Sequence, residues 1–550
     1  NLFTNWKPVS PNLVGDKNIF GIMPDWNPAE IIGTNPGMLS TSLYKEVIMD
    51  KIWSLQRKEY GYKDLTSEPL LVLFGSRPFV NVVASFNSFI PSCIPNNLSL
   101  KISNFCSDYL INNPHLHDKI EFEVIPTCLD LNFDKWSSRF IDSNKFDRKE
   151  IDLIEQSLSD ITRTAFKRID KDLSSIEKLK NKFSDYKKLD FKSFDDIFIL
   201  LDDCCKFGTL PFAHLARSAF ISVAVLKSAV SKNIITQSEM DGFLNSIKTV
   251  SQMLSEDAFL VSEGKLSWES FVDKYGHLRP GTYDIKSQCY SDDPDKFLKP
   301  LIDNATKPNK KSSTWNSDSL SRLCKGLEAI NLPSKESEVD FFLRKSIEGR
   351  EYAKFVFSRN INEVLILIQN FGMERGIDIN DLAELDLKYI EYIYKNEDNV
   401  ELQVNKLLKH SKDNKMLRYA SEMLELPPLI HKEEQFFNFH YPLNQPNFIG
   451  QKSVMADCKH LNVKKIAKSY NLENKVILIP QADPGYDWIF GHKIAGLITS
   501  YGGANSHMAI RAAEFGIPAA IGVGEPKYNS LLQASVIHLD CTNKRIEVIR

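Results

Sequence analysis

Hydrophobic residues follow different spacings along the chain, and the changes in spacing mark its regions. From about Asp147 to Phe271, Leu, Ile and Phe recur at three- and four-residue intervals among Lys, Asp, Glu and Ser, which is typical of amphipathic helices. The same pattern predicts a second helical block from about Glu336 to Glu425, with a cap-rich break at Asp378 to Asp386. The polar, Pro-containing interval from Cys289 to Trp315 is predicted to be a loop.

Other stretches favour β-structure. The apolar segment from Leu70 to Val83 is interrupted by Gly75-Ser76-Arg77-Pro78, which indicates a hairpin. After Pro427 the pattern alternates between short strands and helix: strands at Val476 to Ile479, Ala519 to Val523 and Val536 to Cys541, and a helix at Ser506 to Phe515. We therefore expect a multidomain α+β protein, in which a largely α-helical domain with a small β element precedes a compact α/β domain.

Pro, Gly and Asn clusters suggest the domain boundaries. Residues 1–28 are predicted to be a linker that continues from something upstream, and residues 29–430 a mostly helical domain. Residues 431–455 lack helical periodicity and are predicted to be a hinge before a last domain at 456–550.

Composition narrows the class of protein. With 68 basic and 71 acidic side chains among 550 residues, the formal charge is -3, which argues against a polybasic nucleic-acid or membrane-surface binder. No uninterrupted apolar run approaches the ~18 residues of a membrane span, and no secretory signal is visible. The nine cysteines show neither a disulfide framework nor zinc-like spacing, so we expect reduced thiols, a cytoplasmic location and no metal site in this chain.

The most informative segment runs from Gly496 to Pro518. It predicts a strand, a Gly502-Gly503 turn and a helix that carries His507 in its first turn, beside free backbone N–H groups. Glycines permit close approach of a phosphate, and a helix N-terminus favours an anion on the ring nitrogen. A histidine there could accept a phosphoryl group and release it to a second acceptor. The alternative for any single histidine is a structural or solvent-exposed role.

The full string resembles the phosphohistidine swivelling domain shared by pyruvate phosphate dikinase, phosphoenolpyruvate synthase and rifampin phosphotransferase. The matching positions are Thr499, Gly502, Gly503, Ser506, His507, Ala509, Arg511, Glu514, Gly516, Ile517 and Pro518. The resemblance implies that His507 is the phosphorylated residue and that Thr499, Gly502, Gly503 and Ser506 bind phosphate or substrate. Asn505 stands where plant-type pyruvate phosphate dikinases have a regulatory threonine, so that form of control is not expected.

The resemblance also indicates an acceptor. Only residues 518–550 follow the motif, which leaves no room for the pyruvate barrel of the dikinases, whereas a terminal histidine domain after a helical region resembles rifampin phosphotransferase. The text Tyr275-Gly276-His277-Leu278-Arg279 is similar to its acceptor-domain motif, although Leu278 interrupts it. His277 is therefore a candidate general base or hydrogen-bond donor, and Arg279 a candidate phosphate clamp. The alternative is an ordinary loop histidine and a surface arginine.

Two further cationic positions are candidates. Arg350 and Lys354 are four residues apart in predicted helix, so both lie on one face, and an anion between them would relieve their repulsion. Their placement resembles the phosphate-clamping pair of rifampin phosphotransferase; the alternative is a solvated helix face. Arg217 lies in text similar to the family and is a further candidate for binding phosphate or substrate.

The N-terminal part and Ala482 to Phe490 resemble a capsule-associated branch of the family, the L-glutamine kinase type. This resemblance implies transfer from ATP and Mg²⁺, through His507, to the side-chain amide nitrogen of L-glutamine, with AMP and phosphate as by-products. Asp25, Glu30, Arg57 and Arg77 are available for the ammonium and carboxylate of an amino acid. No ATP-binding text is evident, so we expect a separate nucleotide-binding domain in cis. The alternatives are another small acceptor, such as a sugar or envelope metabolite, or a phosphocarrier charged by a partner.

Overall fold

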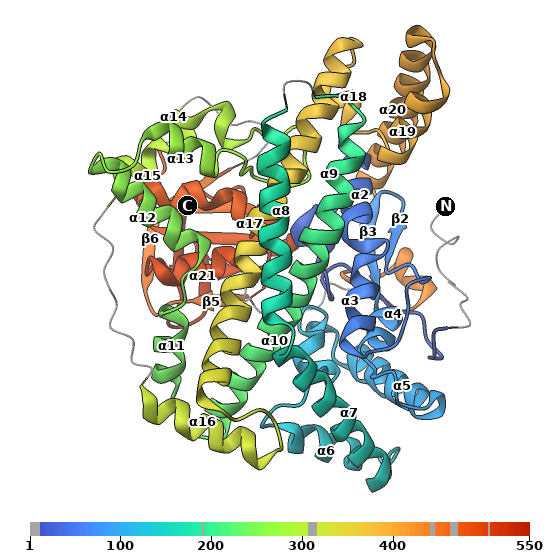
Figure 1. Cartoon of the computed structure of the whole chain (residues 1–550), viewed down its shortest axis with the longest axis vertical. Helices are drawn as coiled ribbons and strands as arrows, with labels where there is room; N and C mark the ends of the chain where they lie inside the picture. The colour runs from blue at the N-terminus through green and yellow to red at the C-terminus, as the bar shows by residue number, and fades with distance from the viewer. Residues whose placement is uncertain (1–11, 190–191, 306–315, 440–445, 462–470, 504–505) are drawn as a thin grey trace.

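A computed structural model of the protein describes residues 12–189, 192–305, 316–439, 446–461, 471–503 and 506–550. The chain forms a helical region up to residue 439 and a C-terminal sheet domain from residue 446, and the two parts pack side by side (Figure 1). The largely helical first part and the sheet-containing last part confirm the expected order of fold types.

The helical region is built from long helices with defined caps. Asp147 and Glu150 form a capping box at the start of α7, and Thr236 and Glu239 form one at α11. The helices are α1 (Pro28–Ile31), α2 (Met38–Tyr44), α3 (Ile52–Tyr60), α4 (Val82–Ser88), α5 (Asn96–Asn112), α6 (Phe133–Asp142), α7 (Arg148–Phe166), α8 (Ile169–Lys187), α9 (Asp196–Cys204), α10 (Leu210–Ser231), α11 (Gln237–Asn245), α12 (Val250–Ser262), α13 (Trp268–Tyr275), α14 (Pro294–Phe297), α15 (Lys299–Asp303), α16 (Ser317–Ala329), α17 (Glu336–Glu374), α18 (Ile379–Leu382), α19 (Leu387–Asn396) and α20 (Val400–Glu422). Both predicted helical blocks are confirmed, including the break at 378–386, where Asp378 and Asp386 cap the short α18 and α19.

The centre of the helical region is the packing of α17 against α8 and α10, which run along the long axis of the molecule in Figure 1. A Cβ at Gly349 would lie 2.9 Å from Leu173 and 3.1 Å from Leu215, so only glycine allows α17 to approach both helices this closely. This close approach fixes the part of α17 that follows Gly349, and that part reaches the sheet domain.

A four-stranded antiparallel sheet lies at the N-terminal side, in the order β2-β3-β1-β4. Strands β2 (Leu71–Phe74) and β3 (Arg77–Asn81) form the predicted hairpin around Gly75 and Ser76. Strand β1 (Phe20–Gly21) pairs with β3 and with β4 (Leu429–Ile430). Residues 12–28 are thus part of the folded helical region rather than a free linker, and Phe20 is fully buried; residues 1–11 of the predicted linker lie outside the described residues.

The C-terminal domain is a seven-stranded sheet in the order β11-β10-β6-β7-β8-β9-β5. The parallel centre is flanked by antiparallel strands on both sides. The strands are β5 (Asn447–Ile449), β6 (Ser453–His460), β7 (Val476–Gln481), β8 (Gly496–Tyr501), β9 (Ala519–Ile521), β10 (Val536–Asp540) and β11 (Arg545–Val548), with helices α21 (His507–Glu514) and α22 (Glu525–Leu531). Alternate residues of β7 face opposite sides: Val476 and Leu478 pack towards α22, whereas Ile477 and Ile479 join the core shared with the helical region.

Two expected boundaries differ from the structure. The sheet domain includes β5 and all of β6, so it begins before the expected residue 456, and the end of the expected hinge 431–455 contributes strand residues. Strand β5 has only three residues, which are too few to show a period. The interval predicted as loop contains α14, α15 and a 3-10 turn at Tyr290–Asp292, although residues 306–315 lie outside the described part.

One helical stretch, Asp196–Ser231, has the length and mean hydropathy of a membrane-crossing helix among the described residues. However, 72% of its most apolar window is buried inside the protein. Its apolar character is therefore accounted for by the helical core.

Candidate functional site

His507 is the first residue of α21 and follows strand β8 through the paired glycines. Ser506 caps the helix, since its Oγ accepts a hydrogen bond from the Ala509 N–H at 3.4 Å. Thr499 Oγ1 accepts a hydrogen bond from the Gly522 N–H at 3.0 Å and so fixes the loop after β9. These side chains shape the backbone around His507; residues 504–505 lie outside the described part.

The two glycines have different surroundings. Gly502 has φ +143°, and a Cβ there would lie 2.6 Å from the Ala482 side chain, so this position needs glycine for conformation and space. A Cβ at Gly503 would meet no atom of the described residues within 4 Å. Gly503 therefore leaves room beside the turn, and its role in phosphate binding stays a prediction.

The His507 ring lies between the two parts of the chain. Its Nε2 atom is 3.0 Å from Asp487 Oδ1, which belongs to the sheet domain, and 3.4 Å from Ser251 Oγ on α12. Its Nδ1 atom is 3.4 Å from Glu351 Oε2 on α17. The sheet domain is thus docked with its histidine against the helical region.

Two carboxylates set the charge of His507. Burial disfavours the imidazolium, but Asp487 and Glu351 outweigh this effect and raise the pKa of His507 to about 9. Burial likewise acts against the two carboxylates, yet the neighbouring cations lower the pKa of Asp487 and of Glu351 to about 2. At neutral pH this site holds an imidazolium between two carboxylates.

Arg511 completes this network one turn along α21. Its Nε atom donates to Asp487 Oδ1 at 2.9 Å, and Nη1 donates to Glu514 Oε2 at 2.9 Å. Burial opposes the charge of Arg511, but both carboxylates raise its pKa. Arg511 therefore holds Asp487 in place against His507, a positioning role.

A cavity of about 50 Å³ opens beside His507. Its walls come from α12, the loop after α13, α17 and the sheet domain, and we name it the His507 cavity. The lining residues are Val250, Leu254, His277, Leu278, Arg279, Thr282, Glu351, Lys354, Phe355, Ser358, Asn362, Gly485, Asp487 and His507. The structure thus brings together His507, His277, Arg279 and Lys354, four of the residues that the sequence analysis selected.

Arg350 and Lys354 lie on the same helix as Glu351. Lys354 lines the cavity and forms no hydrogen bond or ion pair with a described residue, whereas Arg350 Nε lies 3.7 Å from Glu351 Oε1. Glu30 on α1 interacts electrostatically with both cations. Burial raises the pKa of Glu30 to about 7, although Lys354 and Arg350 act in the opposite direction. Glu30 is therefore partly protonated at neutral pH, within electrostatic range of the two cations.

His277 is buried and neutral. Its Nε2 atom lies 3.0 Å from the Phe355 carbonyl oxygen, so the ring donates there, and its Nδ1 atom has no hydrogen-bond partner among the described residues. Burial, assisted by the positive charge of Arg359, lowers the pKa of His277 to about 3. In this tautomer Nδ1 is an acceptor, which makes His277 a hydrogen-bond acceptor rather than an imidazolium donor.

The two remaining predicted cations are engaged elsewhere. Arg279 donates through Nε to Asn362 Oδ1 at 3.1 Å and through Nη1 to the Ser287 carbonyl at 3.0 Å. Its fork therefore fixes the loop from 279 to 287 on α17. Arg217 is separate from the His507 cavity: it is buried, donates to Glu121 and stacks on Phe89 at 4.8 Å.

The residues considered for an amino-acid acceptor are also dispersed. Arg57 and Asp25 pair with each other at 2.7 Å and are both buried, and Arg77 donates to the Ser421 carbonyl at 3.2 Å. Of the four, Glu30 is the one coupled to the cations beside His507.

Residues 471–544 match the family model of the PEP-utilising enzyme, mobile domain. The C-terminal domain thus matches a mobile phosphohistidine domain. Rifampicin phosphotransferase from Bacillus cereus is 24% identical over 284 residues, a match that covers 46% of this chain and 31% of that protein. The chain is a distant homologue that aligns with about a third of this relative.

Three residues that surround the mobile-domain histidine were missed by sequence reasoning: Asp487, Glu351 and Ser251. Asp487 lies in the 482–490 text that carried the capsule-branch resemblance, and Glu351 stands between Arg350 and Lys354. The position of Glu351 next to the proposed cation pair was the sequence signal that could have identified it as a site residue. Ser251 has no such signal, because its role depends on how the mobile domain docks.

No group of three or more His, Cys, Asp or Glu side chains is gathered within the described ranges.

Proposed function

We propose that this chain is the acceptor-side part of a phosphotransferase in which His507 carries the phosphoryl group and passes it to a small molecule that binds beside the ring. The observation that carries this proposal is the position of His507: it starts α21 of the matched mobile domain and lies against α12 and α17. A carrier histidine docked against a second domain has the arrangement that a two-step transfer requires.

The charges around the His507 ring favour transfer of a phosphoryl group to the ring and from it. An unphosphorylated imidazolium is held by Asp487 and Glu351. A phosphoryl group on the ring would be repelled by these carboxylates and attracted by Lys354 and Arg350, which would stabilise charge on the group during transfer. Lys354 is the better placed of the two cations because it lines the cavity without a competing ion pair.

Two groups could receive or orient the proton of the acceptor. His277 lines the cavity as a neutral ring, and its low pKa suits it to align an N–H or O–H rather than to carry away the proton. Glu30, whose pKa is about 7, has the matched basicity of a general base at neutral pH.

The specific acceptor that we propose is the side-chain amide nitrogen of L-glutamine, in capsular phosphoramidate synthesis in the cytoplasm. The support is the sequence likeness of the 23–33 and 482–490 segments to L-glutamine kinases. ATP would donate its β- and γ-phosphates to His507 with release of AMP, and water would remove the outer phosphate. Attack by the amide nitrogen on the remaining phosphorus would then break the N–P bond to His507 and release one proton. ATP and Mg²⁺ would bind mainly to a nucleotide-binding domain in cis.

Phosphorus NMR on the full-length protein with ATP and Mg²⁺, with and without L-glutamine, tests the proposal. We expect AMP and a glutamine-dependent phosphorus–nitrogen resonance, both lost in His507→Asn. AMP without that resonance would reject glutamine and direct the search to a sugar or envelope metabolite. Turnover retained by His507→Asn would overturn the phosphohistidine mechanism, and a chain that is phosphorylated only by a partner protein would be a phosphocarrier.

A further inference from the structure

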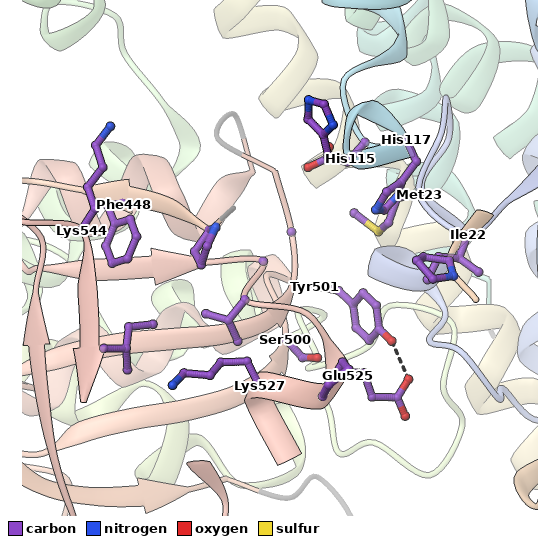
Figure 2. Close-up of a pocket in the computed structure, with 18 of the residues that line it drawn as sticks. Ile22, Met23, His115, His117, Phe448, Ser500, Tyr501, Glu525, Lys527 and Lys544 are labelled. Carbon is purple, nitrogen blue, oxygen red and sulfur yellow. Dashed lines mark hydrogen bonds between the residues drawn. The ribbon is translucent and has the colours of Figure 1, made fainter. Parts of the chain in front are cut away.

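A second and larger cavity, of about 420 Å³, lies between the two parts of the chain, and His507 is not among the residues that line it (Figure 2). We call it the interdomain cavity. Its sheet-domain wall is formed by β5, the ends of β8 and β9, the start of α22 and the β10–β11 turn; its helical-region wall is formed by segments around residues 22–23, 115–118 and 426–428. Its volume is in the range of small-molecule sites.

The sheet-domain wall lies at the carboxyl ends of parallel strands, where α/β sheets commonly bind ligands. Phe448 and Tyr501 contribute aromatic rings, which can contact a flat ring of a ligand. Ser500 also lines the cavity; it is 2% exposed, and its hydroxyl has no hydrogen-bond partner among the described residues. A buried hydroxyl without a hydrogen-bond partner indicates that this wall is built to bond a polar group of a ligand.

Charge is unevenly distributed across the cavity. Lys527 and Lys544 stand on the sheet-domain wall and form no ion pair with a described residue. The nearby Glu525 accepts a hydrogen bond from the Tyr501 hydroxyl at 2.8 Å. Two lysines without carboxylate partners favour an anionic group on this side of the cavity.

The opposite wall has a different chemistry. His115, His117 and Asp118 come from the helical region, and Figure 2 shows the two histidines across the cavity from Lys527 and Lys544. Imidazole and carboxylate groups accept hydrogen bonds from ring amino groups, whereas Ile22 and Met23 supply apolar contact. The ligand that complements both walls is anionic at one end and carries a flat ring with hydrogen-bond donors at the other.

We propose that the interdomain cavity is an effector site for a nucleoside phosphate, and that its occupancy holds the mobile domain in the docked position seen here. A ligand that contacts both walls binds only when they face each other, so it stabilises docking by mass action. The site is distinct from the His507 cavity, shares no lining residue with it, and does not depend on the proposed phosphoryl transfer.

Binding to this chain without turnover tests the site. The probes are AMP, adenosine and inorganic phosphate, measured by isothermal titration calorimetry. We expect AMP to bind at least tenfold more tightly than adenosine, because it adds contact with the lysines. The Lys527→Gln, Lys544→Gln double variant should remove that difference. Phe448→Leu should weaken the binding of AMP and of adenosine to the same extent.

A control variant tests whether the two cavity lysines are specifically required, and hydrogen exchange tests whether AMP holds the two walls together. Lys325→Gln with Lys409→Gln removes two exposed lysines outside the cavity and should leave AMP binding unchanged. Hydrogen exchange should show AMP-dependent protection at residues 115–118 and 500–502 together. No AMP binding, binding that the lysine variant does not weaken, or equal affinity for phosphate and AMP would each overturn the proposal. Protection confined to one wall would overturn the docking part.

Discussion

His507 Nδ1 lies 3.4 Å from Glu351 Oε2, an ion pair that joins residues 156 positions apart and belonging to different parts of the chain. Glu351 lies on α17, whereas Asp487, the other carboxylate on His507, belongs to the same sheet domain as the histidine. Undocking would therefore remove one carboxylate from the ring and leave the other. The charge of His507 and the position of its domain are coupled through the Glu351 contact.

The first prediction concerns Glu351→Gln. We expect the pKa of His507 to fall from about 9 towards its ordinary value, because one of the two carboxylates that overcome burial is removed. NMR titration of the His507 ring measures this change. Glu374→Gln, an exposed carboxylate on the same helix, is the matched control and should leave the titration unchanged. An unaltered His507 pKa in Glu351→Gln would contradict the docked arrangement.

The second prediction is the pH dependence of stability. The pKa of His507 is raised from about 6.5 to about 9, so its stabilising contribution is complete below pH 6.5 and is lost as the pH rises through 9. The free energy of unfolding should fall across this window by an amount on the order of 3 kcal/mol. Urea unfolding of the wild type and His507→Asn at several pH values tests this. If the free energy of unfolding changes equally with pH in both proteins, His507 is ruled out as the source of the change.

The third prediction separates the two halves of the reaction. His277→Asn should leave phosphorylation of His507 by ATP intact but slow transfer to the acceptor by about 100-fold, because the neutral imidazole is lost from the cavity lining. Rapid-quench measurement of phosphohistidine formation and decay resolves the two steps. His410→Asn, which replaces a histidine on α20 outside the cavity, should affect neither step. Equal loss of both steps would point to misfolding rather than acceptor alignment.

The fourth prediction distinguishes two roles for Arg279. Because its fork holds Asn362 and two backbone carbonyls, Arg279→Lys should destabilise the protein by about 1–3 kcal/mol and increase hydrogen exchange in the loop 279–287. Thermal unfolding and hydrogen exchange measure these effects. If the variant keeps wild-type stability and loses only transfer, Arg279 is the phosphate clamp that the sequence suggested.

The fifth prediction tests the network inside the mobile domain. Asp487→Asn leaves His507 and Arg511 without their shared carboxylate, and we expect a loss of about 3 kcal/mol in unfolding free energy together with a lower His507 pKa. Asp457→Asn on exposed β6 is the matched control. If the stability is unchanged while the pKa of His507 is lowered, Glu514 alone is sufficient to compensate the buried charge of Arg511.

Local sequence signals predicted much of the fold. The periodicity of 148–231, the Gly75-Ser76 turn and the strand-glycine-helix order around His507 are local features, and each appears in the structure where expected. Strand β5 was missed because three residues are too few to show a period, and β1 because its pairing with β3 and β4 depends on distant segments.

The site was predictable only in part, for a similar reason. His507, His277 and Lys354 were found as motif or helix-spacing residues, and they meet at one cavity. The roles of Asp487, Glu351 and Arg279 depend on tertiary contacts. Asp487 and Glu351 reach His507 from distant parts of the chain, and Glu351 does so only when the sheet domain is docked. The guanidinium of Arg279 is engaged because Asn362 on α17 accepts its hydrogen bonds. The spacing of residues within a helix carries no information about such partners.

Strand β5, paired antiparallel with β9, closes one edge of the seven-stranded sheet. Without it, β9 would present unpaired N–H and C=O groups, which are a template for pairing with another chain. Because β5 is only three residues long, it covers this edge without offering an extended new one. The first strand of the sheet domain thus also protects that domain against edge-to-edge aggregation.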